Sequence, residues 1–293
     1  MIDQAQKLRL LARNVKEKIE AEINGVRRPM RVVAVTSGKG GVGKTNLTLN
    51  LALALAELGL QTIVLDADLG LANIDVILGI TPRYSLYHVI TGEKTIDQVI
   101  TDTAFGVRVI AGGTGIEELA NLREWQLQGF VNDLNELEGE ADILLVDTGA
   151  GITRNVLSFL LAADEIILLT TPEPTSLTDA YSLLKVLCGY KADKKVGLVV
   201  NKVSSERDGF LAAKKLQLVS ERFLQFRLEY MGHIVQDPWL VKSVMLQQPL
   251  LVCSPQSPAA VCVNQLAAKF CHRSSPKGSG IKVFFQQLGL LFK

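Results

Sequence analysis

One segment near the N-terminus constrains the fold more than any other part of the chain. The β-branched run RVVAVTS leads directly into the glycine-rich stretch GKGGVGKT, and the helical pattern NLTLNLALALAELG follows it. Glycines let backbone N–H groups turn inward around an anion, and the N-terminus of the next helix adds its positive end. The spacing G-x-x-x-x-G-K-T between a strand and a helix therefore predicts a phosphate-binding loop at residues 38–45.

This loop and the residue after it form the predicted phosphate and cofactor site. The ammonium of Lys44 is expected to reach the β- and γ-phosphates, and the Thr45 hydroxyl is expected to be a ligand of Mg²⁺. The predicted nucleotide-binding set at this point is Gly38, Lys39, Gly40, Gly41, Val42, Gly43, Lys44, Thr45 and Asn46.

The rest of the chain alternates short β-branched runs with longer helical stretches. Strands are predicted at residues 31–36, 62–66, 107–110, 143–147, 165–169, 196–200 and 230–235. Several are apolar on both sides, as buried parallel strands are. The alternation predicts an α/β fold with a doubly wound, mostly parallel sheet flanked by helices, in which ligands bind at the carboxyl ends of the strands.

Two of these strand ends carry carboxylates. TIVLDAD places Asp66 at the end of one strand and Asp68 two residues later, and DILLVD ends at Asp147. Hydrolysis of a phosphoanhydride needs Mg²⁺ held by acidic groups and a water in line with the γ-phosphate. Asp66 and Asp147 are therefore predicted to lie at the metal with Thr45, and the glycines at 149–151 are predicted to form a switch loop.

Both termini carry amphipathic helical patterns. Residues 3–24 place apolar side chains at intervals of three and four, and a glycine and a proline break the pattern before the first strand. At the other end, a linker at 274–280 precedes GIKVFFQQLGLLFK, whose one apolar face consists of Ile281, Phe284, Phe285, Leu288, Leu291 and Phe292. That face predicts an interfacial membrane helix, although the same periodicity suits a helix docked on the core. The predicted division is 1–28, 29–273 and 274–293.

Composition limits the remaining possibilities. The formal net charge is only +1, so no overall field attracts nucleic acid, and no specific nucleic-acid partner is expected. None of the four cysteines forms a CxxC pair, which argues against a zinc site. We expect a cytoplasmic protein that associates reversibly with the inner face of the cell membrane.

The form KGGVGKT, with a second lysine at Lys39, resembles the deviant Walker A motif of the MinD/ParA/NifH family. The resemblance covers residues 31 to about 270 and implies an ATPase with ATP/ADP and Mg²⁺ as cofactors. It implies that Lys39 reaches the phosphates of the partner subunit in an ATP-dependent homodimer, and that Asp68 orients the attacking water. Lys39, Lys44 and Asp68 are thus the expected catalytic residues, and turnover is expected to be slow and regulatory.

The same resemblance suggests how the base is bound. Asn201 ends the predicted strand VGLVVNKV, where an amide can pair with adenine N6 and N7, or can simply turn the chain. Asp237 and Pro238 match the family's adenine-flanking loop, and Glu173 matches a segment at its dimer face.

The N-terminal sequence narrows the family. Asp3, Gln4 and Ala5, followed by Leu8 and Arg9, resemble the DQAxxLR element of FlhG-type proteins, also called FleN or YlxH. This implies that the first helix stimulates an FlhF-type signal-recognition GTPase, with Gln4 orienting a water. It also implies control of flagellar number and placement, flagellar basal-body ring components as partners, and a membrane-targeting last helix. The plainer alternative is a helix that packs on its own domain.

Other functions stay open at this point. A MinD-like ATPase that positions the division site has the same chemistry, although the DQA element argues against it. A nucleotide-binding module without significant hydrolysis is a second alternative, and Asp68, Lys39 and Lys44 argue against that one. A DNA-partitioning ATPase would need a basic face, and an iron–sulfur carrier a CxxC.

Overall fold

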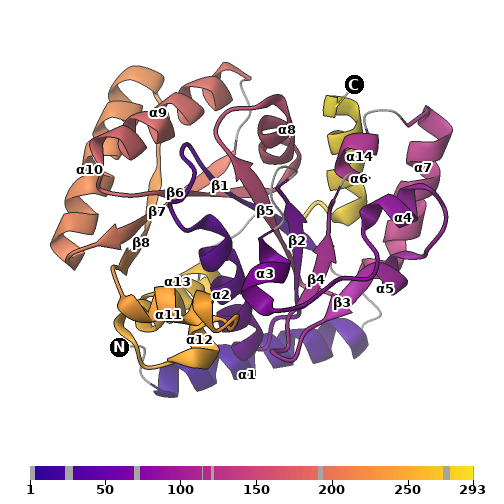
Figure 1. Ribbon diagram of the computed structural model, residues 1–293, viewed down its shortest axis with the longest axis horizontal. Helices are drawn as coiled ribbons and strands as arrows, with labels where there is room; N and C mark the ends of the chain where they lie inside the picture. The colour runs from indigo at the N-terminus through magenta and orange to yellow at the C-terminus, as the bar shows by residue number, and fades with distance from the viewer. Residues whose placement is uncertain are drawn as a thin grey trace.

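The computed structural model describes residues 4–23, 29–68, 73–113, 115–119, 122–190, 194–272 and 278–292, and these form one eight-stranded sheet between two layers of helices (Figure 1). The strand order is β3-β4-β2-β5-β1-β6-β7-β8, and every pair is parallel except β3 with β4. The strands are β1 (Arg31–Ser37), β2 (Thr62–Ala67), β3 (Ile100–Asp102), β4 (Arg108–Ala111), β5 (Ile143–Ala150), β6 (Glu165–Thr170), β7 (Lys195–Val203) and β8 (Glu229–Val235). The predicted doubly wound, mostly parallel α/β fold is confirmed.

Each face of the sheet is buried by its own layer of helices, because alternate side chains of a strand point to opposite faces. In β1, Val32 and Ala34 enter one core, whereas Val33 and Val35 enter the other. The first core contains α4 (Leu86–Ile90), α5 (Ile96–Val99), α7 (Glu124–Asp133), η2 (Leu134–Leu137), α8 (Arg154–Ala162), α9 (Pro174–Gly189), α10 (Glu206–Leu224) and α14 (Ile281–Phe292), and α6 (Gly115–Glu118) packs on α4. The second contains α1 (Gln4–Ile23), α2 (Lys44–Glu57), α3 (Ile74–Leu78), α12 (Leu250–Cys253) and α13 (Pro258–His272), with α11 (Pro238–Met245) beside α12.

Seven predicted strands correspond to β1, β2 and β4–β8, with ends that differ by a few residues. The antiparallel edge strand β3 was not predicted, because three residues of mixed polarity carry no periodic signal. The strand β5 also continues beyond Asp147, since Ala150 still pairs with Ser37 of β1. The first two residues of the predicted switch loop, 149 and 150, therefore lie in strand β5.

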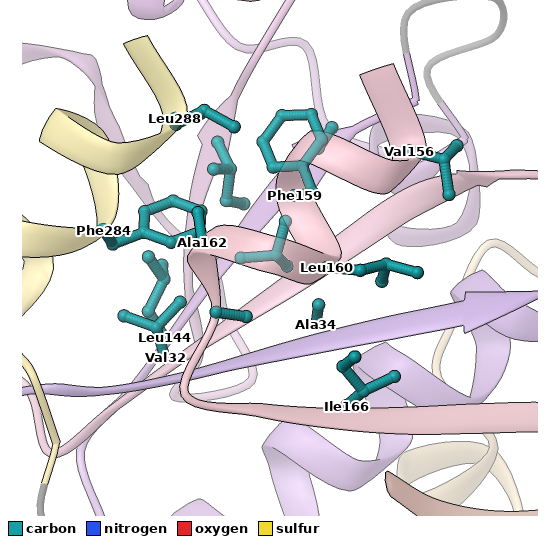
Figure 2. Packing of buried hydrophobic residues seen from close by; sticks show 14 of the residues in the cluster. Val32, Ala34, Leu144, Val156, Phe159, Leu160, Ala162, Ile166, Phe284 and Leu288 are labelled. Carbon is teal, nitrogen blue, oxygen red and sulfur yellow. The ribbon is translucent and has the colours of Figure 1, made fainter. Parts of the chain in front are cut away.

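The last helix is docked on the body of the protein. In Figure 1, α14 lies between α8 and α7, and Figure 2 shows Phe284 and Leu288 beside Phe159 of α8. The predicted apolar face is buried, with 0–1% of Ile281, Phe284, Phe285 and Leu288 exposed. The Phe284 and Phe159 rings lie 6.3 Å apart, and a Cβ on Gly289 would come within 2.6 Å of Leu127. Of the two interpretations of this segment, an interfacial membrane helix or a helix docked on the core, the structure shows the docked helix.

The described end of the predicted linker is also bound to the body. The backbone N–H of Ser279 donates to Asp164 (3.1 Å), and that of Gly280 donates to the carbonyl of Met30 (3.2 Å). The first part of the linker, residues 274–277, lies outside the described residues.

The N-terminal helix α1 rests on the opposite layer, against the end of α2. Leu10 is buried, the amide of Asn14 donates to the carbonyl of Leu58 (2.8 Å), and Lys7 pairs with Glu57. Asp3 and the side chain of Gln4 lie outside the described residues, and Ala5 is exposed. Across the part of the chain that is described, no helix combines the length and the hydropathy needed to span a membrane.

Candidate functional site

The glycine-rich loop joins β1 to α2 at the carboxyl edge of the sheet, where it was predicted. Gly43 has φ of 95°, a left-handed backbone that suits glycine, and it directly precedes α2. Lys44 and Thr45 occupy the buried first turn of that helix. Gly38 packs against α9 so closely that a Cβ would lie 2.3 Å from the backbone of Asp179. The packing of Gly38 and the left-handed backbone of Gly43 therefore fix the shape of the loop.

Two carboxylates meet the start of α2. In the register of β2 with β5, Asp66 and Asp147 are direct neighbours. The Lys44 ammonium lies 3.8 Å from Asp147 Oδ1, and the Thr48 hydroxyl donates to the same oxygen (3.2 Å). Burial raises the pKa of Asp147, while Lys44 and the hydroxyls of Thr45 and Thr48 act in the opposite direction. The other oxygen, Oδ2, is buried and has no hydrogen-bond partner among the described residues.

Asp66 adds negative charge beside Asp147. Its carboxylate accepts hydrogen bonds from the backbone N–H groups of Asp68 (3.2 Å) and Ile74 (3.4 Å). Burial, and then the charge of Asp147, raise the pKa of Asp66 to about 6. Two buried carboxylates with raised pKa values indicate a site that a bound cation would stabilise.

The donors present fit Mg²⁺ bound together with a nucleotide. Asp147 has one unpartnered oxygen, the Thr45 hydroxyl acts on the same carboxylate, and Asp66 is its neighbour in the sheet, so all the donors are hard oxygen atoms. No group of three or more His, Cys, Asp or Glu side chains suited to a metal occurs in the described ranges. Mg²⁺ takes few protein ligands and fills its shell with water and phosphate oxygens.

Asp68 lies beside the segment that follows Asp147. It is half-buried, and a Cβ on Gly149 would be 3.7 Å from its Oδ1. That segment is tied to β1, because the N–H of Gly151 donates to the carbonyl of Ser37 (2.9 Å). The placement suits a carboxylate that orients water at the γ-phosphate, and this role stays a prediction.

Lys39 points to the surface and is held by α9. Its ammonium lies 3.0 Å from Glu173 Oε2 and 3.3 Å from the Thr175 hydroxyl. Both charged side chains are well exposed, at 42% for Lys39 and 61% for Glu173. Lys39 is thus engaged by its own chain, so a role on a partner's phosphates requires this pair to open.

Asn201 contacts the loop rather than facing open solvent. It is buried at the end of β7, its amide donates to the carbonyl of Val42 (2.7 Å), and its oxygen accepts from the N–H of Lys202 (2.8 Å). The predicted pairing with adenine stays a prediction. Sequence reasoning missed Lys202, whose ammonium donates to the carbonyl of Gly41 (2.8 Å). An exposed lysine near the end of a strand gives no signal of such a contact.

Two further residues predicted to contact the nucleotide, Asp237 and Asn46, differ in whether their side chains have hydrogen-bond partners in the described structure. The Asp237 carboxylate caps α11 through the N–H of Trp239 (2.9 Å) and accepts from the N–H of Ala259 (3.0 Å), while Pro238 is the first residue of α11. The side-chain oxygen of Asn46 is buried without a hydrogen-bond partner in the described structure. An unsatisfied group beside a phosphate loop suits a ligand contact.

Comparisons with known proteins agree with this geometry. The model of the ParA family, described as NUBPL iron-transfer P-loop NTPase, matches residues 28–271. The antiactivator FleN of Pseudomonas aeruginosa is 40% identical, over 84% of this chain and 88% of that protein. The flagellum site-determining protein YlxH of Helicobacter pylori is 32% identical, over 88% and 89%.

Solved structures show the same fold. The cell division ATPase MinD of Pyrococcus furiosus has a TM-score of 0.65 and 27% identity, covering 82% of this chain and 98% of that one. MinD of Pyrococcus horikoshii, solved with Mg-ADP, has a TM-score of 0.64 and 28% identity, covering 81% and 94%. With the loop, its second lysine and the paired strand-end carboxylates in place, the chain belongs to the MinD/ParA family of P-loop ATPases, in its FlhG-type branch.

Proposed function

We propose that this chain is an ATP-driven switch that controls flagellar number and placement. It binds ATP and Mg²⁺, dimerises, attaches to the membrane through α14 and hydrolyses ATP slowly. The observation that carries this proposal is that α14 docks on α8, the helix directly after the segment that follows Asp147. The similarity to FleN and YlxH supports the flagellar role.

The nucleotide site has a short physical connection to α14. Arg154, the first residue of α8, donates from Nη2 to the carbonyl of Leu291 in α14 (3.3 Å). Phe159 of α8 packs against Phe284 and Phe292. A change of the loop at the γ-phosphate would move α8 and loosen this packing. ATP binding then favours the released helix.

The chemistry follows from the residues at the site. The loop amides and Lys44 hold the phosphates, Asn46 lies next to them, and Asp68 orients the attacking water. Mg²⁺, held by Thr45, Asp147 and Asp66, neutralises phosphate charge when it is bound. Lys39 leaves Glu173 and contacts the partner subunit's phosphates, which makes dimerisation dependent on ATP. Asn201, Asp237 and Pro238 flank the adenine.

Released α14 would present one apolar face to lipid, formed by Ile281, Phe284, Phe285, Leu288, Leu291 and Phe292. A single interfacial helix binds weakly, whereas two on one dimer act together through their effective concentration. The protein would thus be cytoplasmic after hydrolysis and peripheral on the inner face of the cell membrane when it holds ATP.

The N-terminal helix supplies the second output. Asp3, Gln4 and Ala5 begin the element that stimulates an FlhF-type GTPase, and flagellar basal-body ring components are the further partners. Leu8 and Ile19 on α1 are exposed, which supports a surface for such a partner.

A vesicle-binding experiment tests the switch. Flotation with anionic vesicles should recover the full chain with ATP and not with ADP. Asp68→Ala should prolong attachment by slowing phosphate release, and Lys44→Ala should abolish it. Equal recovery with both nucleotides would contradict the switch, and unchanged phosphate release by Asp68→Ala would contradict the role of Asp68.

A MinD-like role in division-site positioning is the second candidate, supported by a Synechocystis MinD that is 35% identical over 82% of this chain. The GTPase rate of an FlhF-type partner separates the two. The full chain should raise that rate and Gln4→Ala should not. No stimulation by either protein would favour the MinD-like role.

A further inference from the structure

Three carbonyl groups of the glycine-rich loop are held by side chains. The Ser37 hydroxyl donates to the carbonyl of Lys39 (2.9 Å). The ammonium of Lys202 donates to that of Gly41 (2.8 Å), and the amide of Asn201 donates to that of Val42 (2.7 Å). The last two donors, Lys202 and Asn201, are neighbours near the end of β7.

Holding these carbonyls also sets the direction of the loop's N–H groups. A trans peptide is planar, and its C=O and the N–H of the next residue point in opposite directions. No cis peptide bond occurs in the described residues. When Lys202 holds the carbonyl of Gly41, the N–H of Val42 points away from Lys202, and Asn201 acts in the same way on the N–H of Gly43. These N–H groups are the anion donors of a phosphate loop.

The backbone of Lys202 is unusual and supports a specific role. It has φ of 57°, in the left-handed region that non-glycine residues rarely occupy. The Asn201 oxygen accepts from the Lys202 N–H (2.8 Å), and the pairing of β7 with β8 is irregular between Val200 and Val203. Such a conformation persists where its surroundings determine it, and here it directs the lysine at the loop.

We infer that the end of β7 is a clamp that pre-organises the phosphate loop, with Lys202 as a positioning residue for the nucleotide's phosphates. Asn201 is the buried half of the clamp, and Gly43 leaves room for it, since a Cβ there would be 2.6 Å from Asn201 Nδ2. The inference rests on the proposed nucleotide site and adds a group that orients the loop before ligand binds.

Nucleotide affinity tests the clamp. Lys202→Met should weaken binding of fluorescent ADP about three- to tenfold, the loss of a charge-assisted hydrogen bond. Binding of GDP should weaken by the same factor, because the clamp acts on phosphates and not on the base. Lys202→Gly keeps the left-handed backbone without strain and should lose affinity equally while unfolding at no lower temperature. Lys202→Arg should restore part of the affinity, and Lys214→Met, an exposed lysine on α10, should have no effect.

A spectroscopic measurement excludes a purely structural effect. In nucleotide-free protein, Lys202→Met should shift the amide resonances of Val42 and Gly43, with the rest of the spectrum kept. Unchanged ADP affinity in Lys202→Met would overturn the clamp. A loss of affinity for ADP without a loss for GDP would overturn it as well. Wild-type chain that binds neither ADP nor GDP would instead overturn the proposed nucleotide site.

Asn201→Ala separates the clamp from base recognition. If Asn201 acts only in the clamp, ADP and GDP lose affinity by equal factors. A fall in the preference for ADP over GDP would overturn the part of the clamp assigned to Asn201 and assign that residue to the base.

Discussion

The two terminal helices carry similar amphipathic patterns but are bound to the body in different ways. In α14, Ile281, Phe284, Phe285 and Leu288 are 0–1% exposed. Among the described side chains of α1, Leu10 is 2% exposed, whereas Leu8 and Ile19 remain 64% and 49% exposed.

The difference lies in the surfaces that receive the helices. The helix α14 enters a site formed by α7, α8 and η2, where aromatic rings pack edge-on and Gly289 admits Leu127. Among its described contacts, the helix α1 packs on α13 and meets the end of α2 through Leu10, the Asn14 hydrogen bond and the exposed Lys7–Glu57 ion pair. Each fully buried apolar side chain contributes roughly 1.5–3 kcal/mol, so releasing α14 requires an energy source, whereas α1 detaches at small cost.

The largest expected effect tests whether α14 belongs to the core in solution. Phe284→Ala should lower the free energy of unfolding by about 3–5 kcal/mol in urea, through lost burial and a cavity beside Phe159. The control Leu290→Ala changes a residue that is 68% exposed and should stay within about 0.5 kcal/mol. Similar values for the two variants would mean that α14 is undocked in solution.

Overpacking at Gly289 should loosen the same helix without removing its apolar face. In Gly289→Val the added side chain clashes with Leu127. The substitution should weaken the docking of α14 on the body by about 1–3 kcal/mol. Because the membrane face is kept, vesicle binding with ADP should rise toward the level seen with ATP. Gly129→Val, on α7 with no heavy atom within 4 Å of its added Cβ, is the matched control. Unchanged binding with ADP would break the link between docking and attachment.

A smaller effect is expected from the anchor of α1. Leu10→Ala should lower the free energy of opening of α1, measured by hydrogen exchange of its amides, by about 1–2 kcal/mol. The exchange of the sheet amides should not change, because α1 opens as a local unit. Leu8→Ala, which removes an exposed side chain, should have no such effect. Simultaneous loss of protection in the sheet would show that α1 is as integral as α14.

The smallest expected effect concerns the hydrogen bond of Asn14. Asn14→Ala removes the donor to Leu58 and should weaken docking of α1 by about 0.5–1 kcal/mol, measured by the same exchange experiment. In a Leu10→Ala background the added effect should shrink, because the two contacts hold one unit. Full additivity would mean that the two contacts act independently.

Local spacing was sufficient to predict most of the fold and the centre of the site. The loop from Gly38 to Thr45, the buried parallel strands and the carboxylates at Asp66 and Asp147 all follow from patterns a few residues long, and the structure places them at one edge of the sheet. The edge strand β3 could not be predicted, because its three residues are selected by pairing with β4 rather than by their own pattern.

What the sequence by itself determined was the existence and type of each element, since hydrophobic period and glycine placement act over short range. The tertiary structure alone decided which surface receives each apolar face, as the burial of α14 and the exposure of much of α1 show. It also decided that Lys202, 161 positions from Gly41 in the chain, holds the phosphate loop. Contacts of this kind depend on shape and on the meeting of distant segments, which no local pattern encodes.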